Sequence, residues 1–343
     1  MSKAVTLWIP DFLNKQRILE SGQAWSDLSL PALQTLFKKG DLFPATSAAN
    51  PENKNFYVTA SNLFHLNQTL PVAATMAKQA LQDFDGNLFW MKIDPVQMVP
   101  DRDTLVLIPG NDLAITEDEA RALIVAFNAH FQQDRVEIEY GSPTDWFLNI
   151  KQAVDIKTTP LPNASYQQLQ EKYPTGHAAP YWRQLLNEAS MLFYTHPVNE
   201  HRRLEGRPEI NGVWLWGEGA LNVAEVYPRD SAKIWSANTY LEGVASLAGA
   251  QSDSFPETLQ TCLGSEQEQH LLMPEFVNQR LDKLTQEAWI ESVNWLETDW
   301  LAPLLSALKT KQIHSLLLEL GDGYRYHIEP KHLNRFWRIK NRI

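Results

Sequence analysis

The sequence has little that would suit a disulfide-bonded or membrane-embedded protein. Cys262 is the only cysteine among 343 residues, which excludes a disulfide framework and a cysteine-based metal site. No apolar run approaches membrane-spanning length, and the apolar stretch 4–10 is short for a signal segment and precedes no small-residue cleavage site. We therefore expect a cytoplasmic protein with no membrane partner.

An excess of basic residues is also missing. The 30 Lys and Arg residues stand against 41 Asp and Glu, which gives a formal net charge of −11. Because phosphate backbones attract clustered cations, an acidic chain whose basic cluster at 335–342 is short is a poor candidate for nucleic-acid binding. We expect no nucleic-acid partner, and the sequence does not indicate a protein partner.

What is present is an alternation of strand-like and helix-like segments, typical of an α/β sheet. Between 87 and 157 the pattern becomes strand–strand–helix–strand–strand, and Thr116 with Glu119 forms a capping box at the start of that helix. On this helix we expect Leu123, Ile124 and Phe127 to be buried. The sequence therefore predicts a core formed by 1–86 and 158–343, with an inserted α+β cap domain at 87–157.

The densest set of polar residues lies just before the apolar run 213–216, which ends at a glycine turn. A continuous apolar run that ends at a turn is typical of a buried parallel strand. Ligands of open α/β sheets bind at the carboxyl ends of such strands. Arginine and glycine-turn N–H groups suit a small phosphate or carboxylate. We predict a ligand site made of His196, Asn199, Arg202, Arg203, Gly217 and Gly219. The alternative is a solvated loop whose arginines pair with neighbouring acids.

The same segment carries a family resemblance, through His196–Asn199 and then the pattern Asn-x-x-Trp-Leu-Trp-Gly-x-Gly at 211–219. It resembles the phosphoglycerate-mutase-related proteins of bacteria often labelled RpfE-type regulatory proteins. These are similar in turn to the archaeal-type, cofactor-independent phosphoglycerate mutases. The resemblance continues at Pro10-Asp11 and at 335–338. It implies an alkaline phosphatase-like fold, with a doubly wound core sheet.

The resemblance also implies a two-metal chemistry, with several Asp and His ligands and a serine that carries the phosphoryl group. Asp11 is followed by Phe12 where the family has glycine, and Ser61-Asn62 before His65 replaces the family's Ser-Asp. No histidine after position 222 lies beside an aspartate. We therefore regard Asp11, Ser61 and His65 as weak catalytic remnants, and we expect no metal site.

These observations together predict a catalytically divergent, regulatory relative of the mutases that needs no cofactor and binds a small phosphorylated or carboxylate ligand. The alternative is an active phosphomutase or phosphatase that acts on a small phosphorylated acid such as phosphoglycerate. That enzyme would use two divalent ions (Mn, Zn or Mg), because paired metals stabilise both the attacking and the leaving oxygen. Metal content separates the two hypotheses.

Overall fold

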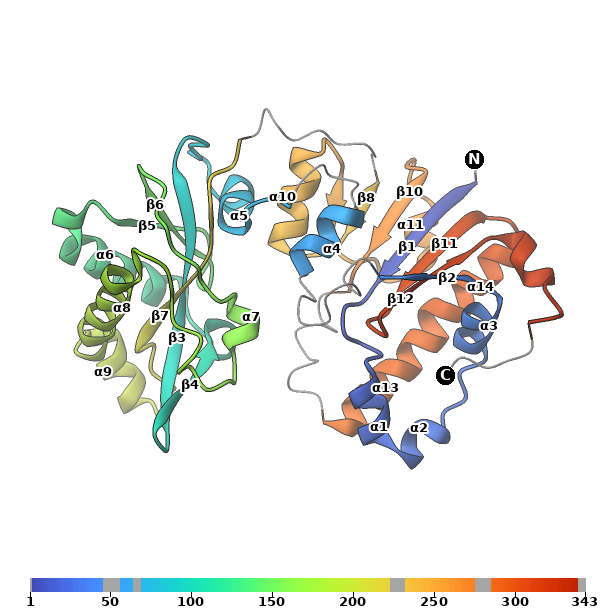
Figure 1. Cartoon of the computed structure of the whole chain (residues 1–343), viewed down its shortest axis with the longest axis horizontal. Coiled ribbons are helices and arrows are strands. Elements are labelled where there is room, and N and C mark those ends of the chain that lie inside the picture. Colours follow the sequence, from blue (N-terminus) through green and yellow to red (C-terminus); the bar gives the residue numbers. More distant parts are fainter. Residues whose placement is uncertain (1, 46–55, 64–68, 223–231, 275–284, 339–343) are drawn as a thin grey trace. The chain divides into compact units, whose positions relative to one another are not determined.

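The computed structural model describes residues 2–45, 56–63, 69–222, 232–274 and 285–338 (Figure 1). The chain divides into two compact units: unit 1 is Met1–Thr69 with Val226–Ile343, and unit 2 is Leu70–Glu225. These bounds differ from the expected ones, because the segments between 158 and 219 pack within unit 2 and not within the core. No helix in the described ranges has both the length and the apolar character needed to cross a membrane.

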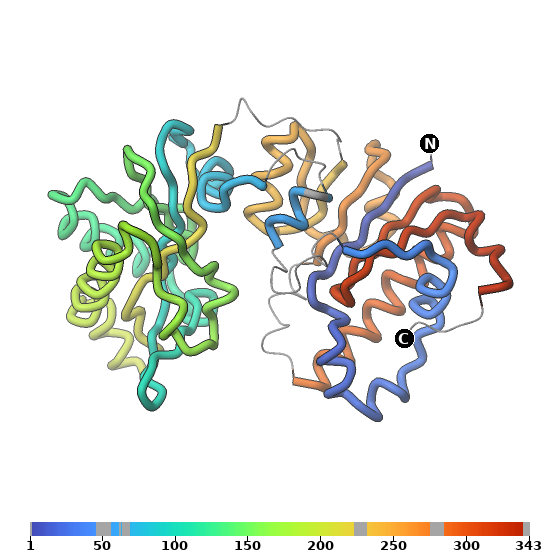
Figure 2. The backbone as a smooth tube through the Cα atoms, in the orientation of Figure 1, coloured from blue at the N-terminus to red at the C-terminus, as the bar shows by residue number. Residues whose placement is uncertain are grey.

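Unit 1 is built on a seven-stranded sheet. Its strands are β1 (Lys3–Trp8), β2 (Asp41–Pro44), β8 (Lys233–Trp235), β9 (Ser252–Asp253), β10 (Gln269–Leu272), β11 (Ile313–Glu319) and β12 (Tyr324–Ile328). The order is β2-β12-β11-β1-β10-β8-β9, and only β12 and β2 are antiparallel to their neighbours. Figure 2 shows the N-terminal strand in blue between orange and red segments from the end of the chain.

Helices cover both faces of this sheet. They are α1 (Lys15–Ser21), α2 (Gln23–Ser26), α3 (Pro31–Lys39), α4 (Phe56–Leu63), α10 (Thr239–Leu247), α11 (Leu259–Leu263), α13 (Gln286–Trp295), the π-helical turn η5 (Leu296–Leu301), α14 (Ala302–Lys309) and the short 3₁₀ helix η6 (Pro330–Asn334). Because strand side chains alternate between faces, Val5 and Leu7 pack with α3, α13 and α14, whereas Trp8 stacks on Phe56 of α4 at 4.8 Å. This is the doubly wound α/β arrangement that the sequence predicts.

Unit 2 is a five-stranded antiparallel sheet with helices. The strands are β3 (Phe89–Asp101), β4 (Thr104–Pro109), β5 (Glu137–Tyr140), β6 (Trp146–Ile150) and β7 (Gly212–Gly219). The helices are α5 (Val72–Ala80), α6 (Glu117–His130), α7 (Leu161–Ala164), α8 (Ala179–Tyr194) and α9 (Pro197–Leu204), with 3₁₀ turns η2 (Gly110–Asp112) and η3 (Gln132–Asp134). Apolar residues of α6 and α8, among them Phe127 and Leu185, form one core with the sheet.

The position of β7 corrects the expectation for the apolar run 213–216. It was expected to be a parallel strand of the core sheet, but β7 runs antiparallel to β3, with Val213 opposite Pro95 and Trp216 opposite Lys92. Both strands are almost wholly buried along this pairing. A continuous apolar run indicates burial on two faces, and it does not reveal which strand it pairs with.

Candidate functional site

In unit 1, the carboxyl ends of the parallel strands β1 and β11 border a small pocket of about 80 Å³. Ligands of open α/β sheets bind outside such strand ends, which makes this edge the candidate functional site. The lining residues come from β1 and the turn after it, from α4, and from the end of β11: they include Trp8, Asp11, Phe56, Thr59, Glu319, Gly321 and Gly323.

Asp11 is held in an unusual backbone conformation at this pocket. Its φ is 55°, in the left-handed region that residues other than glycine rarely adopt. A Cβ at Gly321 would lie 2.3 Å from the Asp11 nitrogen, so only glycine allows the two turns to pack. The Leu13 N–H donates to the Leu320 carbonyl at 2.7 Å and fixes the turn against the end of β11. The exposed Asp11 side chain is therefore anchored at the carboxyl edge.

Glu319 is the second carboxylate at this pocket, and it is not among the residues predicted from the sequence. It is the last residue of β11, is buried, and accepts a hydrogen bond from the Arg325 Nε at 2.5 Å. Burial raises the pKa of Glu319, although the Arg325 charge opposes that shift. The available sequence signal was an acid within an apolar run, two residues before a glycine turn.

Ser61 does not present its hydroxyl to the pocket. The side chain is buried on α4, and the hydroxyl donates to the Tyr57 carbonyl at 2.9 Å, one turn earlier in the helix. Thr59, on the same helix, lines the pocket instead, and it is not among the residues predicted from the sequence. His65 lies outside the described residues. Of the three proposed remnants, the structure therefore places only Asp11 at the pocket.

The two divalent ions implied by the family resemblance need several Asp and His ligands. Within the described ranges there is no group of three or more His, Cys, Asp or Glu side chains that could hold a metal ion. The edge itself offers Asp11 and Glu319, and Glu319 already neutralises Arg325. Hard divalent cations require more oxygen ligands than this pair provides. The described donors do not fit a two-metal centre.

Three of the described histidines of unit 1 have structural partners. His270 is buried on β10, and its Nδ1 accepts a hydrogen bond from the Trp235 indole at 3.2 Å. The His327 Nε2 lies 2.9 Å from the Ser315 hydroxyl, and the His332 Nε2 lies 3.5 Å from an Asp41 oxygen.

Burial of His270 predicts an acid-sensitive unit 1. Desolvation, reinforced by the charges of Lys3 and Lys233, lowers the pKa of His270 to about 4. The unfolded chain then binds more protons than the folded chain below about pH 6.5, so stability is full above that pH and is lost as the pH falls toward 4. We expect urea denaturation to show a loss of about 2 kcal/mol between pH 7.5 and pH 5 from this residue.

The matched control for this prediction is His270→Gln, which retains a hydrogen-bond acceptor near Trp235 but does not titrate. The difference in the free energy of unfolding between the wild-type protein and the variant should become smaller as the pH falls, because only the wild-type protein loses the contribution of His270. A wild-type protein and a variant that lose stability in parallel between pH 7.5 and pH 5 would show that His270 is not the titrating group.

The ligand site predicted in the segment 196–219 lies within unit 2, and its side chains are committed to the fold. Arg202 is fully buried; its guanidinium donates to Glu119 at 2.7 Å, to the Pro208 carbonyl at 2.6 Å and to the Leu113 carbonyl. The Arg203 guanidinium binds Glu209 at 2.9 Å. The arginines are paired with acids, as in the alternative, but Arg202 is buried on α9 and pairs with the distant Glu119, so it does not lie in a solvated loop beside a neighbouring acid.

The other predicted ligand residues have similar roles. The His196 ring accepts a hydrogen bond from the Val198 N–H at the start of α9, and burial lowers its pKa. The buried Asn199 amide bridges the Phe193 and Ile210 backbones. Gly217 and Gly219 have positive φ and pack against Val72 and Pro71 at the start of α5, where a Cβ at Gly219 would lie 2.5 Å from Pro71. These glycines serve helix packing.

Comparison with known proteins supplies the family context. No protein-family model matches the chain. The 2,3-bisphosphoglycerate-independent phosphoglycerate mutase of Methanosarcina barkeri is 28% identical over 141 residues, which are 39% of this chain and 35% of that protein. The probable mutase of the same kind from Geobacter sulfurreducens is 26% identical over 162 residues, 46% of this chain and 41% of that protein. The chain thus spans less than half the length of these relatives.

A solved structure extends the comparison to the whole fold. The PH0037 protein from Pyrococcus horikoshii matches over 96% of this chain and 87% of its own, with a TM-score of 0.55 and 14% sequence identity. The chain therefore has an α/β fold of the alkaline phosphatase-like type, as the sequence predicts. It is a distant homologue of the cofactor-independent phosphoglycerate mutases.

Proposed function

We propose that this protein is a catalytically divergent relative of the cofactor-independent phosphoglycerate mutases, of the RpfE-type regulatory kind. It acts by binding a small phosphorylated or carboxylate ligand and not by transferring phosphoryl groups. The observation that carries the proposal is the chemistry of the carboxyl edge. There, Asp11 is accompanied by an ion-paired Glu319, and the Ser61 hydroxyl donates to its own helix.

The proposal keeps the expectations of a cytoplasmic location and of no nucleic-acid or membrane partner. The net charge of −11 and the single buried cysteine support them. The alternative, a metal-dependent phosphomutase or phosphatase, is favoured by the homology and by the position of Asp11 at the end of β1.

A combined metal and activity measurement tests the proposal. The purified full chain is analysed for Mn, Zn and Mg, and is then incubated with 3-phosphoglycerate in the presence of each ion while 2-phosphoglycerate is followed. The Methanosarcina barkeri relative is the positive control. We expect no stoichiometric metal and no product above the protein-free rate, because too few ligands face the edge. Two metal ions per chain, or turnover that disappears in Asp11→Asn, would establish the alternative.

A further inference from the structure

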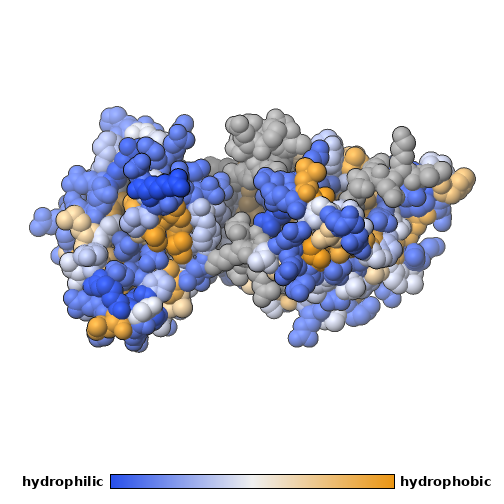
Figure 3. All heavy atoms as spheres, turned by 90° about the horizontal axis from the view of Figure 1, so that it is seen from below, coloured by the Kyte–Doolittle hydropathy of each residue, from blue (hydrophilic) through white to orange (hydrophobic). Residues whose placement is uncertain are grey.

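Two neighbouring aromatic residues of unit 1, Phe336 and Trp337, are exposed to solvent. Their exposed fractions are 82% and 63%, and their rings meet edge to face with centroids 5.1 Å apart. In the view of Figure 3, apolar side chains reach the surface of unit 1 in small groups among hydrophilic ones. Single exposed apolar residues are ordinary, whereas an adjacent aromatic pair offers a larger apolar area for a partner to cover.

The backbone on both sides of this pair is anchored. The Arg335 guanidinium binds both oxygens of Asp41, at 2.6 and 3.0 Å, and the Arg338 Nη2 binds one of them at 2.8 Å. Arg338 also donates to the Gly40 carbonyl. The Lys39 ammonium donates to the Arg335 carbonyl. Because charge-assisted and bidentate bonds fix geometry, the two aromatic side chains extend from a preorganised backbone, which lowers the entropic cost of binding.

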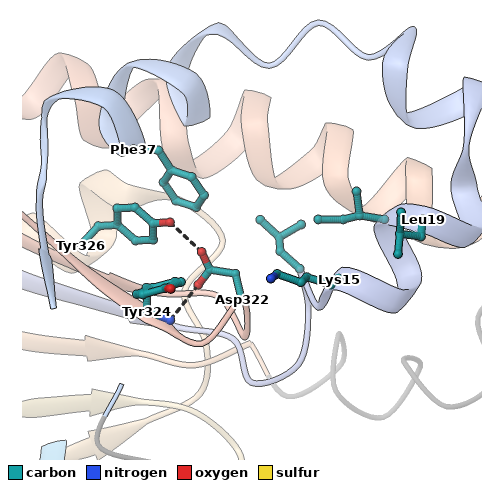
Figure 4. A pocket seen from close by; sticks show the side chains of 8 residues that line it. Lys15, Leu19, Phe37, Asp322, Tyr324 and Tyr326 are labelled. Atoms are coloured by element: carbon teal, nitrogen blue, oxygen red, sulfur yellow. Dashed lines mark hydrogen bonds between the residues drawn. The ribbon is translucent and has the colours of Figure 1, made fainter. Parts of the chain in front are cut away.

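The structure beneath these anchors is also fixed. Helix α3 ends at Lys39, two residues before Asp41, and packs on β12 through Phe37. The Phe37 ring is stacked on Tyr326 with centroids 3.8 Å apart, and the Tyr326 hydroxyl donates to Asp322 at 2.6 Å (Figure 4). The aromatic pair is therefore attached to the sheet through a stacked and hydrogen-bonded layer.

The surface around the pair is basic, although the chain is acidic. Residues 38–41 and 335–338 contain four cations and one acid, which leaves a local net charge of +3, whereas the whole chain has −11. They are Lys38, Lys39, Arg335, Arg338 and Asp41. The hydrogen bond from Arg335 holds the pKa of Asp41 well below its usual range, so this acid stays charged but balances only one of the cations. The excess positive charge favours a partner that carries acidic groups.

From this arrangement we propose that Phe336, Trp337 and the basic residues around them bind an acidic segment of a partner protein that carries apolar side chains. The carboxylates of the partner lie against Lys38 and Arg338, and its apolar side chains cover the two rings. Aromatic and arginine side chains are the types that dominate interface energetics most often. A short acidic segment covers only the basic surface, whereas a nucleic acid or an anionic membrane also meets the acidic surroundings, which repel it.

The proposal is tested by fluorescence anisotropy of labelled synthetic peptides with the full chain. The probe repeats the unit Glu-Leu-Glu-Tyr; one control peptide has Ser in place of Leu and Tyr, and another has Lys in place of Glu. We expect sub-millimolar binding of the probe that weakens as salt is added, and affinity at least about tenfold lower for both controls. No binding of the probe, or equal binding of the serine peptide, would overturn the assignment. So would tighter binding of phosphatidylserine vesicles or of single-stranded DNA.

Aromatic variants locate the binding. Phe336→Ser combined with Trp337→Ser should weaken the probe at least about tenfold. Leu19→Ser combined with Met191→Ser removes two other exposed apolar side chains and should leave the affinity unchanged. Because all four side chains are exposed, both double variants should fold, which circular dichroism and the urea midpoint verify. Equal affinities of the two double variants would refute the proposal.

Charge variants test the basic part of the surface. Lys38→Glu should weaken the probe at least about threefold more than Lys151→Glu, an exposed position of unit 2 whose replacement changes the net charge equally. Equal affinities of these two variants would show that only the overall charge matters, and the proposed surface would be wrong. These results do not depend on metal or mutase activity, so they are independent of the outcome for the proposed function.

Discussion

Replacing Arg202 with methionine is expected to destabilise the protein by about 3–5 kcal/mol, the usual cost of removing one partner from a buried ion pair. The Arg202 guanidinium connects α9 to the start of α6 through Glu119 and to the Leu113 carbonyl. Its side chain is fully buried, so water cannot replace these contacts. Urea denaturation followed by tryptophan fluorescence measures the loss, and hydrogen exchange of α6 and α9 assigns it to unit 2.

The neighbouring arginine provides a matched control. The Arg203 side chain is 39% exposed and pairs with Glu209, so Arg203→Met should change the free energy of unfolding by about 1 kcal/mol or less. If the Arg202→Met variant is as stable as Arg203→Met, Arg202 is not a structural residue, and the prediction of an anion site at this arginine would regain support.

Replacing Lys92 with methionine is the second change with a large expected effect, about 3–5 kcal/mol at pH 7.5. Lys92 is fully buried on β3, with its Nζ 2.9 Å from an Asp94 oxygen and 2.7 Å from an Asp145 oxygen. It also lies 4.4 Å from the centre of the Phe147 ring. Methionine fills a similar volume but leaves the buried Asp94 without its cation.

The pH dependence of this loss is diagnostic. Burial raises the pKa of Asp94 to about 6, even with the Lys92 charge acting to lower it. Without Lys92 the pKa rises further, so the folded variant holds a proton that the unfolded chain gives up above about pH 4. The variant should therefore recover stability relative to wild type as the pH falls from 7.5 to 5.

A double variant completes the test. Asp94→Asn removes the buried charge, so Lys92→Met combined with Asp94→Asn should be more stable at pH 7.5 than Lys92→Met alone. Denaturation curves of the three proteins at both pH values give the comparison. A Lys92→Met loss that does not change with pH, or a double variant that is no more stable than the single one, would contradict the role given to Asp94.

The local elements of this protein could be predicted from neighbouring residues. The capping box of Thr116 and Glu119 is present at the start of α6, and Leu123, Ile124 and Phe127 are buried as expected. The alternation of strands and helices predicted the α/β sheet of unit 1, and the family resemblance implied its doubly wound arrangement. These features follow from spacings of two to four residues, which fix the capping hydrogen bonds and the buried face of a helix or strand.

The carboxyl edge could be predicted only in part. Asp11 lies there because β1 ends three residues earlier, at Trp8, and the sequence already indicated this position. Thr59 and Glu319 join it only because α4 and β11 are brought beside β1, and the close packing of the turn at Asp11 requires Gly321, 310 positions later. Ser61 sits on the right helix but donates to its own backbone.

The sequence by itself therefore determined the α/β class, the elements and the distant relationship to the mutases. The tertiary structure decided the partner of β7 and the environment of Arg202. Strand pairing and the burial of a charge depend on residues far away in the sequence: Arg202 binds Glu119 and Leu113, 83 and 89 positions earlier. The local sequence around Arg202 is the same whether its guanidinium binds an anion or forms a buried ion pair in the core. Only the three-dimensional surroundings of the side chain distinguish the two.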